Sequence, residues 1–579
     1  MANMIQNAKD SISALLTAAC EKAVEKGRLP EGATLSGTVE IPKDTTNGDY
    51  AANHAMTGAR ALHMAPRKIA EALVENLDLE GSWFASVEVA GPGFINFRLA
   101  PSWYADVLKC VTEEGADYGR VDEGHGKKLM VEFVSANPTG PMHMGNARGG
   151  VLGDALASVM DRAGYSVWRE FYVNDAGNQI EKFASSIDAR YRQLLLGEDA
   201  VAFPEDGYQG EDIKELARAF YDEHGDTYLN KGAAERHAAM ARFGLDRNIP
   251  KMQADLKRYG VEYDEWFFES SLHESGYVAE TIEKLTERGC TYEKDGALWL
   301  KTAQILSENL LRAGKKQEEI DRLELKDDVL KRANGFYTYF AADIAYHRNK
   351  LEKRGFDYAI NVWGADHHGH VARLKGALDA LGLDGEHRLQ IVLMQLVKLM
   401  SDGHEVRMSK RTGKAISLTN LLDDIPVDSA RYFFNSRPES PVLFDLELAQ
   451  RQDNENPVYY VQYAHARICT MIANLAAEGH EVPASADAAF LTDETEKELI
   501  KQLAALPEEI RLAARDYDPS RVNKYVTELA ARFHRFYTIC RIRGAEPGVL
   551  EARLWLSDCV RRVIAISLSV IGVTAPEKM

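Results

Sequence analysis

A strand, a turn rich in helix breakers, a helix and a second strand follow one another in the first third of the chain. Residues 129–134 form a largely apolar run typical of a buried strand, and 135–140 contain Asn, Pro and Gly. Apolar positions then recur at the helical period over 151–159, and Gly164 supplies a stop. Residues 167–173 predict the second strand. Because parallel strands need a crossover helix, this order predicts a βαβ unit within a parallel α/β sheet.

The alternation of strand and helix stops and then resumes. Between about 185 and 326 the pattern is charged and mainly helical, which is typical of an insertion. Beyond it we expect a helix over 339–353, a strand over 358–363, a helix over 370–381 and a strand over 389–400. The sequence therefore predicts a sheet that is split by the insertion and rejoined after it.

A chain of 579 residues is too long for a single hydrophobic core, so several domains are expected. We predict an α/β multidomain protein: an N-terminal α+β domain over 1–119, a Rossmann-like parallel-sheet catalytic domain over 120–427 that carries the insertion, and an all-α bundle over 428–579. The apolar stretch 563–573 is too short for a bilayer, which takes about 20 residues. It predicts a buried terminal helix.

Charge and cysteine usage restrict the function. The net charge of −19 lacks the broad positive field that coats nucleic acid non-specifically, so any nucleic-acid site must be local. The six cysteines are scattered and form no CxxC pair, which predicts reduced thiols in a cytoplasm and no structural metal bound by the protein. We expect neither a signal peptide nor a membrane partner.

The strongest local motif is Asn-Pro-Thr-Gly-Pro-Met-His-Met-Gly-Asn-Ala-Arg-Gly-Gly over 137–150, where the first strand passes into its helix. Ligands of open α/β sheets bind at the carboxyl ends of strands, where a helix N-terminus offers free N–H groups to phosphates. Gly145 would let the backbone approach a nucleotide, and His143 and Asn146 could donate to phosphate oxygens. A histidine that only caps or packs the turn is the alternative.

A second motif, Arg-Met-Ser-Lys-Arg-Thr-Gly-Lys over 407–414, follows the last strand of the resumed sheet. Several cations on a loop that contains glycine suit a clamp on a triphosphate. Taken alone, the segment is equally typical of an exposed basic turn.

Together the two motifs resemble the HIGH and KMSKS motifs of the class I aminoacyl-tRNA synthetases, in the same order and on opposite sides of an insertion. Two more stretches, 131–138 (Val-Glu-Phe-Val-Ser-Ala-Asn-Pro) and 456–467 (Asn-Pro-Val-Tyr-Tyr-Val-Gln-Tyr-Ala-His-Ala-Arg), narrow the resemblance to the arginyl-tRNA synthetases. The resemblance covers nearly the whole chain. The chain departs from the motifs at Asn146, which replaces His, and at Arg407 and Arg411, which replace Lys and Ser.

The resemblance implies which residues meet ATP. Catalytic roles fall to His143, Asn146 and Lys410. The residues that it assigns to ATP binding are His143, Gly145, Asn146, His367, Met408, Ser409 and Lys410.

A site for arginine must offer carboxylates in a plane, because a guanidinium group is a rigid, permanently charged fork of donors. Tyr339 and Asp343 are four apart on one predicted helix and therefore share a face. An ordinary amphipathic surface helix would show the same spacing. The residues that the resemblance assigns to arginine are Glu132, Ser135, Asn137, Tyr339, Asp343 and Asp366.

The dense stretch Asp366-His367-His368-Gly369-His370 raises the alternative of a transition-metal site. It follows a predicted strand, and no distant Cys or His-Glu-x-x-His element completes a set of ligands. We therefore expect no metal site here. We place Asp366 in the arginine pocket, with His367 and His370 beside it.

A local nucleic-acid site is predicted late in the chain, where basic residues recur at helical spacing among aromatic ones. A solvated helix face is the alternative interpretation. The basic residues of this pattern are Arg521, Lys524, Arg532 and Arg535, followed by Arg541 and Arg543. The tRNA contacts assigned here and by the resemblance are Tyr459, Arg467, Arg532 and Arg535.

The resemblance implies an arginine–tRNA ligase. ATP, with Mg²⁺ as its substrate complex, would activate L-arginine to arginyl-adenylate, and arginine would pass to the 3′ end of tRNA(Arg) with release of AMP and pyrophosphate. A monomer, tRNA-binding domains at both ends and activation that needs bound tRNA are also implied. Two alternatives stay open: another class I synthetase or nucleotidyltransferase, and a catalytically idle tRNA-binding protein derived from a synthetase.

Overall fold

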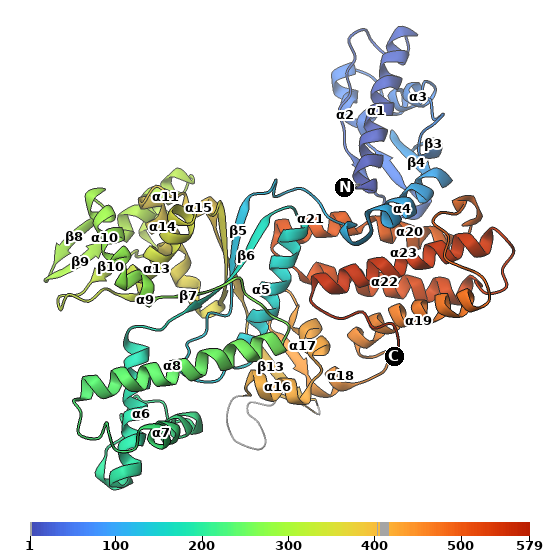
Figure 1. Cartoon of the computed structure of the whole chain (residues 1–579). Helices are drawn as coiled ribbons and strands as arrows, with labels where there is room; N and C mark the ends of the chain where they lie inside the picture. The colour runs from blue at the N-terminus through green and yellow to red at the C-terminus, as the bar shows by residue number, and fades with distance from the viewer. Residues whose placement is uncertain (1–2, 402, 406–415) are drawn as a thin grey trace.

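The computed structural model describes residues 3–401, 403–405 and 416–579. Its centre is a sheet that includes β5, β6 and β7 (Figure 1). The sheet has five strands in the order β12-β11-β5-β6-β7, and every neighbouring pair is parallel. All the carboxyl ends therefore lie at one edge, and the predicted Rossmann-like parallel sheet is confirmed. The strands are β5 (Lys128–Glu132), β6 (Ser166–Val173), β7 (Glu265–Phe268), β11 (Tyr358–Gly364) and β12 (Leu389–Met394).

Alternate residues of the strands serve two cores, because side chains alternate across a sheet. Leu129 and Val131 of β5 belong to the core that includes α5. Tyr172 of β6 and Ala359 of β11 belong to the core under α13 and α14. Helices thus cover both faces, as a parallel sheet requires. These helices are α5 (Met144–Arg162), α13 (Tyr339–Arg348) and α14 (His368–Ala380).

Helix α5 lies very close to the sheet because glycine faces the end of β5. A Cβ atom at Gly153 would lie 2.1 Å from Cγ of Phe133, whose ring is buried. The helix ends ahead of Gly164, which has φ of +89°, as the sequence predicted. Gly153 therefore fixes how near the start of α5 comes to the strand ends.

The insertion contains both helices and strands. Three helices pack around a core of their own that includes Phe183, Phe220 and Phe243. The chain then forms β7, the edge strand of the main sheet, which the sequence pattern did not reveal because its four residues lie among charged helices. A small antiparallel sheet in the order β10-β9-β8 comes after it. The elements are α6 (Asn178–Leu196), α7 (Glu211–His224), α8 (Ala233–Arg258), α9 (Ser270–Glu274), α10 (Tyr277–Glu287), β8 (Thr291–Lys294), β9 (Ala297–Leu300), α11 (Thr302–Arg312), α12 (Gln317–Asp321) and β10 (Asp328–Lys331).

The strand expected over 389–400 is two strands in two sheets. Strand β12 ends at Met394, and β13 begins at Val397 in a sheet of order β14-β13-β15. Between them, the Gln395 N–H donates to the carbonyl of Pro438. Strand β15 lies beyond residue 427 and pairs in parallel with β13, so sheet structure crosses the predicted boundary. The elements are β13 (Val397–Ser401), β14 (His404–Glu405), α16 (Leu418–Asp424), α17 (Val427–Phe434), β15 (Val442–Asp445) and α18 (Leu446–Gln450).

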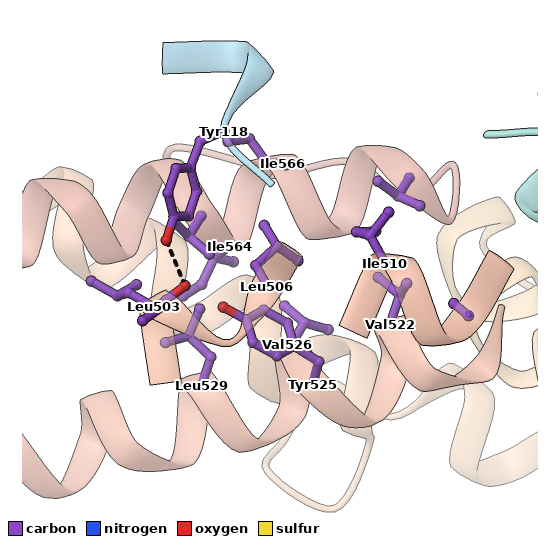
Figure 2. Packing of buried hydrophobic residues seen from close by; sticks show 14 of the residues in the cluster. Tyr118, Leu503, Leu506, Ile510, Val522, Tyr525, Val526, Leu529, Ile564 and Ile566 are labelled. Atoms are coloured by element: carbon purple, nitrogen blue, oxygen red, sulfur yellow. Dashed lines mark hydrogen bonds between the residues drawn. The ribbon is translucent and has the colours of Figure 1, made fainter. Parts of the chain in front are cut away.

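The N-terminal domain (blue) lies beside the C-terminal bundle (red) in Figure 1, away from the sheet. It combines helices with a sheet of order β1-β2-β4-β3. Its elements are α1 (Met4–Glu25), β1 (Val39–Glu40), β2 (Tyr50–Ala52), α2 (His54–Leu62), α3 (Pro66–Val74), β3 (Phe84–Ala90), β4 (Phe94–Leu99) and α4 (Pro101–Glu114). Helix α4 already packs against the bundle, and after it the O–H of Tyr118 donates to the carbonyl of Leu503 at 2.9 Å within a buried apolar cluster (Figure 2).

The bundle that ends the chain is helical, as predicted. The apolar stretch 563–573 mostly falls within α23, where Val563, Ile564 and Leu568 are buried. Among the described helices, none is both long and apolar enough to cross a membrane. The bundle helices are α19 (Pro457–Ala477), α20 (Glu494–Ala504), α21 (Leu506–Asp516), α22 (Ser520–Ile539) and α23 (Val549–Val570).

The close approach of α5 predicts unequal effects of two alanine substitutions on the free energy of unfolding. Gly153→Ala should lower it by about 1–3 kcal/mol, because the new methyl group overlaps Phe133. In the matched control Gly150→Ala, the nearest atom would lie at 3.6 Å, so the higher helix propensity of alanine should raise stability by up to about 1 kcal/mol. Urea denaturation of both variants checks this, and equal stabilities would contradict it.

Candidate active site

A cavity of about 780 Å³ lies at the carboxyl edge of the sheet. Its walls come from the ends of β5, β6, β11 and β12, the start of α5 and helix α13. The sequence-predicted residues that line it are Glu132, Ser135, Asn137, His143, Gly145, Asn146, Asp343, Asp366, His367 and His370. Tyr339 is not among the lining residues; it is 44% exposed and lies beside Gly177. Met408, Ser409 and Lys410 lie outside the described residues.

The turn that enters the cavity from β5 is strained. Val134 has φ of +69°, and the Ser135 N–H donates to the carbonyl of Phe133 at 3.0 Å. A γ-turn with positive φ is rare, and a β-branched residue makes it more costly. The turn places the Ser135 hydroxyl where it donates to Glu132 and accepts from the backbone N–H of Tyr172. Strain of this kind is often found at binding sites.

His143 caps helix α5 and still keeps a donor. Its Nδ1 accepts from the N–H of Gly145 at 3.2 Å, and the Asn146 side chain accepts from the His143 N–H at 3.0 Å. Because Nδ1 is an acceptor, a neutral ring carries its proton on Nε2. The capping alternative and the predicted donor role are therefore compatible.

The described segment that follows the second motif reaches the first motif. Ser417 forms an antiparallel bridge with His143, and the Leu418 N–H donates to the carbonyl of Met142 at 2.8 Å. Residues far apart in sequence thus meet at the start of α5.

Asp343 on α13 is oriented by a chain of hydrogen bonds. Its Oδ2 lies 2.9 Å from Nε2 of His370, and His370 Nδ1 lies 3.3 Å from a guanidinium nitrogen of Arg373. Arginine can only donate, so Nδ1 accepts and Nε2 donates to Asp343. Arg373 also pairs with Asp328 at 2.6 Å. The chain of bonds orients one carboxylate oxygen of Asp343, whose side chain is still 35% exposed.

Glu132 is engaged beneath the cavity. Its carboxylate pairs with Lys350 at 2.5 Å, and both side chains are buried. Lys350 belongs to a π-helical turn over 349–353 that continues α13, and its ammonium also donates to Oδ1 of Asn361. The charge of Glu132 is therefore already neutralised within a buried ion pair.

The same hydrogen bonds determine which ring nitrogen of His347 carries the proton. Because Asn361 accepts from Lys350, its amide group donates to Nε2 of His347 at 2.7 Å. Nδ1 then carries the ring proton and donates to the carbonyl of Asp343 at 2.8 Å. Burial, reinforced by the charge of Lys350, holds the pKa of His347 well below its ordinary value. His347 is thus a neutral ring that supports the backbone of Asp343.

A second buried ion pair lies beside the first. Glu170 on β6 is the register partner of Glu132 and is fully buried. Arg354, which ends the π-helical turn, pairs with Glu170 at 2.5 Å, and the O–H of Tyr346 donates to it at 2.6 Å.

Sequence reasoning missed several residues that line the cavity. Asn174 and Gln395 come directly after β6 and β12, so the carboxyl-end rule could have found them. His347 is four residues after Asp343, so helical spacing could have found it. The missed residues are Val134, Tyr172, Asn174, Tyr346, His347, Val362, Trp363, Gly364, Ala365, Met394, Gln395 and Leu396.

The stretch from Asp366 to His370 is divided between two environments. His370 contacts Asp343, whereas the side chains of Asp366 and His367 are 82% and 59% exposed. Within the described part of the chain, no group of three or more His, Cys, Asp or Glu could hold a metal ion.

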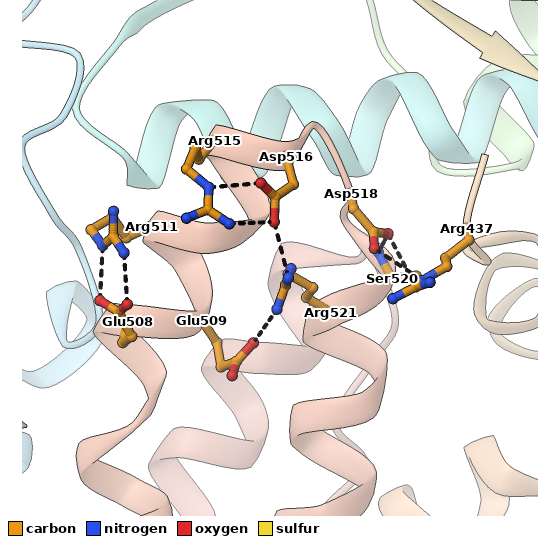
Figure 3. A network of polar contacts seen from close by, with 9 residues as sticks. All are labelled: Arg437, Glu508, Glu509, Arg511, Arg515, Asp516, Asp518, Ser520 and Arg521. Carbon is orange, nitrogen blue, oxygen red and sulfur yellow. Dashed lines mark hydrogen bonds and ion pairs between the residues drawn. The ribbon is translucent and has the colours of Figure 1, made fainter. Parts of the chain in front are cut away.

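The basic residues of α22 differ in their partners. Arg521 pairs with Asp516 at 2.9 Å and Glu509 at 3.5 Å (Figure 3). Arg532 pairs with Glu498 and Glu528. Arg535 is exposed and has no hydrogen-bond or ion-pair partner within residues 416–579 or the other described ranges.

Aromatic rings and one cation lie along a single face of α19. Tyr459 and Tyr463 stack with their ring centroids 6.2 Å apart. The guanidinium group of Arg467 lies 4.3 Å from the ring centroid of Tyr537 on α22. This surface, like Arg535, belongs to the bundle.

Comparison with known proteins divides the chain into three matched parts. The arginyl-tRNA synthetase N-terminal domain matches 10–99, the catalytic domain of class I tRNA synthetases (R) matches 108–453, and the DALR anticodon-binding domain matches 461–579.

Full-length relatives match as well. The arginine–tRNA ligases of Ruminiclostridium cellulolyticum and Caldanaerobacter subterraneus subsp. tengcongensis are 51% and 52% identical, each over 100% of both chains. The arginyl-tRNA synthetase structure from Thermus thermophilus shares the fold, with a TM-score of 0.72, 21% identity and coverage of 99% of this chain and 100% of that one. A catalytic-domain match over more than half of the chain, with relatives half identical from end to end, shows that the chain belongs to the arginyl-tRNA synthetase family.

Proposed function

We propose that the cavity at the carboxyl edge is where this chain, an arginine–tRNA ligase, binds ATP and arginine side by side. One observation carries this proposal: the start of α5 and the carboxylate of Asp343 line the same cavity. The first suits phosphates and the second suits a guanidinium group. A nucleotidyltransferase would need no cation site, so this pairing favours the ligase.

In the first step the arginine carboxylate attacks the α-phosphorus of ATP. Arginyl-adenylate forms as the bond to the β-phosphate oxygen breaks, and pyrophosphate leaves. The Nε2–H of His143 and the free N–H groups of α5 face growing charge on phosphate oxygens. Positioning and charge stabilisation supply the acceleration, since the protein forms no covalent bond.

In the second step a ribose hydroxyl at the 3′ end of tRNA(Arg) attacks the activated carbonyl, and AMP leaves. Mg²⁺ enters with ATP as the substrate complex and neutralises its phosphates. The ATP-binding assignment is His143, Gly145, Asn146, His367, Met408, Ser409 and Lys410, with His143, Asn146 and Lys410 in catalytic roles.

The arginine assignment is centred on Asp343, with Asp366, Ser135 and Asn137 around it. Glu132 contributes from within its ion pair with Lys350. Tyr339, one helical turn before Asp343, is exposed and does not line the cavity, so its contact with arginine remains a prediction.

The tRNA contacts proposed for the bundle are Tyr459, Arg467, Arg532 and Arg535. Arg535 and Arg467 make the larger contributions, because Arg532 is already paired with two carboxylates. We also propose that the chain acts as a monomer in the cytoplasm.

ATP–pyrophosphate exchange tests the function. Exchange should require both arginine and tRNA(Arg). Exchange without any amino acid would favour a nucleotidyltransferase, and exchange with another amino acid would favour another class I synthetase. No exchange, with tRNA still bound, would favour an idle tRNA-binding protein.

Replacing Asp343 should weaken the handling of arginine selectively. Asp343→Asn removes the charge that pairs with the guanidinium group, so kcat/KM for arginine should fall about 10- to 100-fold while KM for ATP changes little. The matched control is Asp384→Asn, which alters another Asp–His pair, at 2.7 Å, outside the cavity. Equal losses for ATP and arginine would contradict the assignment.

Arg535 and Arg521 form a matched pair on α22. Arg535→Ala should raise KM for tRNA roughly tenfold, which corresponds to about 1.4 kcal/mol for one charged contact, and the effect should shrink at high salt. Arg521→Ala should leave KM for tRNA nearly unchanged, because its guanidinium already pairs with Glu509 and Asp516. Steady-state aminoacylation checks both variants. Unaltered tRNA kinetics for Arg535→Ala would show that this face of α22 is an ordinary solvated surface that does not contact tRNA.

A further inference from the structure

We propose that Arg148 is a positioning residue for ATP: its buried guanidinium fork holds the cavity wall formed by Met394, Gln395 and Leu396 at a fixed distance from the start of α5. The inference rests on the proposed function, since that wall and the start of α5 enclose the space assigned to the nucleotide.

Arg148 lies two residues after Asn146 on α5 and is fully buried. Its Nη1 donates to the carbonyl of Gln395. Its Nη2 donates to the carbonyls of Arg437 and Ser440, each at 2.9 Å, with longer contacts to Ser436 Oγ and the Pro438 carbonyl. One side chain thus joins α5 to two segments that are distant in sequence.

Each of the three wall residues is held by a contact of its own. The peptide of Gln395 is held at both ends, by Arg148 at its carbonyl and by the Pro438 carbonyl at its N–H. The Leu396 carbonyl accepts from the N–H of Val442 at 3.1 Å. Met394 packs over Gly149, where a Cβ atom would lie 3.2 Å from the methionine methyl group.

Packing alone does not explain a charge at this place. Among the described residues, no carboxylate lies within ion-pair distance of Arg148, and burial lowers the pKa of Arg148 to about 10, with Glu439 opposing the shift from further away. The side chain is therefore still a cation at neutral pH. A buried cation without a paired anion is costly, and a planar fork that meets several carbonyls at once is the property that guanidinium alone supplies.

Replacing Arg148 should affect the kinetics for ATP and not those for arginine. Arg148 contacts the wall beside α5, whereas Asp343 and His370 come from α13 and α14 and are held by Arg373 and His347. A displaced wall would misplace ATP relative to the start of α5, and small displacements of reacting groups cost large factors in rate.

The test compares Arg148→Met and Arg148→Lys with the matched control Arg431→Met. Arg431 is also fully buried and donates to backbone carbonyls, those of Tyr259, Gly260 and Ile571, but it lies outside the cavity. Unlike Arg148, it also pairs with a carboxylate, that of Asp154, so the control reports the loss of a buried arginine away from the cavity. Exchange kinetics with ATP and arginine varied in turn, thermal unfolding, and ATP affinity by isothermal titration are measured on the full chain with tRNA(Arg).

Both Arg148 variants should lower kcat/KM for ATP about tenfold or more and leave KM for arginine within about twofold. Arg148→Lys keeps the charge but loses the fork, so it should share the defect; it also carries the test if Arg148→Met does not fold. Arg431→Met should lower the unfolding temperature and keep normal ATP kinetics well below that temperature.

Three results would overturn the inference: normal ATP kinetics in Arg148→Lys, equal losses for ATP and arginine, or the same ATP defect in Arg431→Met at matched stability. The titration separates this failure from failure of the proposed function. If the wild-type chain showed no arginine-dependent exchange, weaker ATP binding by Arg148→Lys would still support the positioning role, and unchanged ATP binding would refute it.

Discussion

Two buried carboxylates on neighbouring strands determine how the catalytic domain packs. Glu132 and Glu170 are register partners, so two like charges lie side by side away from water. Lys350 and Arg354 neutralise them, and leaving such a charge unpaired typically costs about 3–5 kcal/mol. Both cations come from the end of α13. The two carboxylates are therefore neutralised when α13 packs over the sheet, and the same packing brings Asp343 to the cavity.

The two faces of the sheet contribute different chemical groups to the cavity. Helix α5 presents its N-terminus on one side, where glycine lets it lie against the strand ends. Helix α13 presents a carboxylate from the other side. Under the proposed function, an anionic and a cationic substrate would occupy one cavity without competing for the same groups, and their reacting ends would meet above the carboxyl edge.

Local patterns in the sequence were enough for much of this arrangement. Strand ends, helical spacing and turn residues made His143, Gly145 and Asp343 candidates, because each signal lies within a few residues, and the resemblance supplied the roles expected of them. The roles of Lys350 and Arg148 were out of reach, because they depend on a π-helical turn and on carbonyls far along the chain. Helical spacing also grouped Arg532 with Arg535, since a pattern of basic residues does not reveal which of them already have acidic partners.

The π-helical turn over 349–353 has a consequence for how the gene for this chain can vary. Its turn is wider than that of an α-helix, and Lys350 and Arg354, which are four residues apart, both face the sheet there. Deleting a single residue between them would rotate Arg354 by about 100° relative to Lys350, so the two cations could no longer meet their two carboxylates together. Insertions and deletions among related sequences should therefore be found in the exposed loops of the insertion and be absent from this turn.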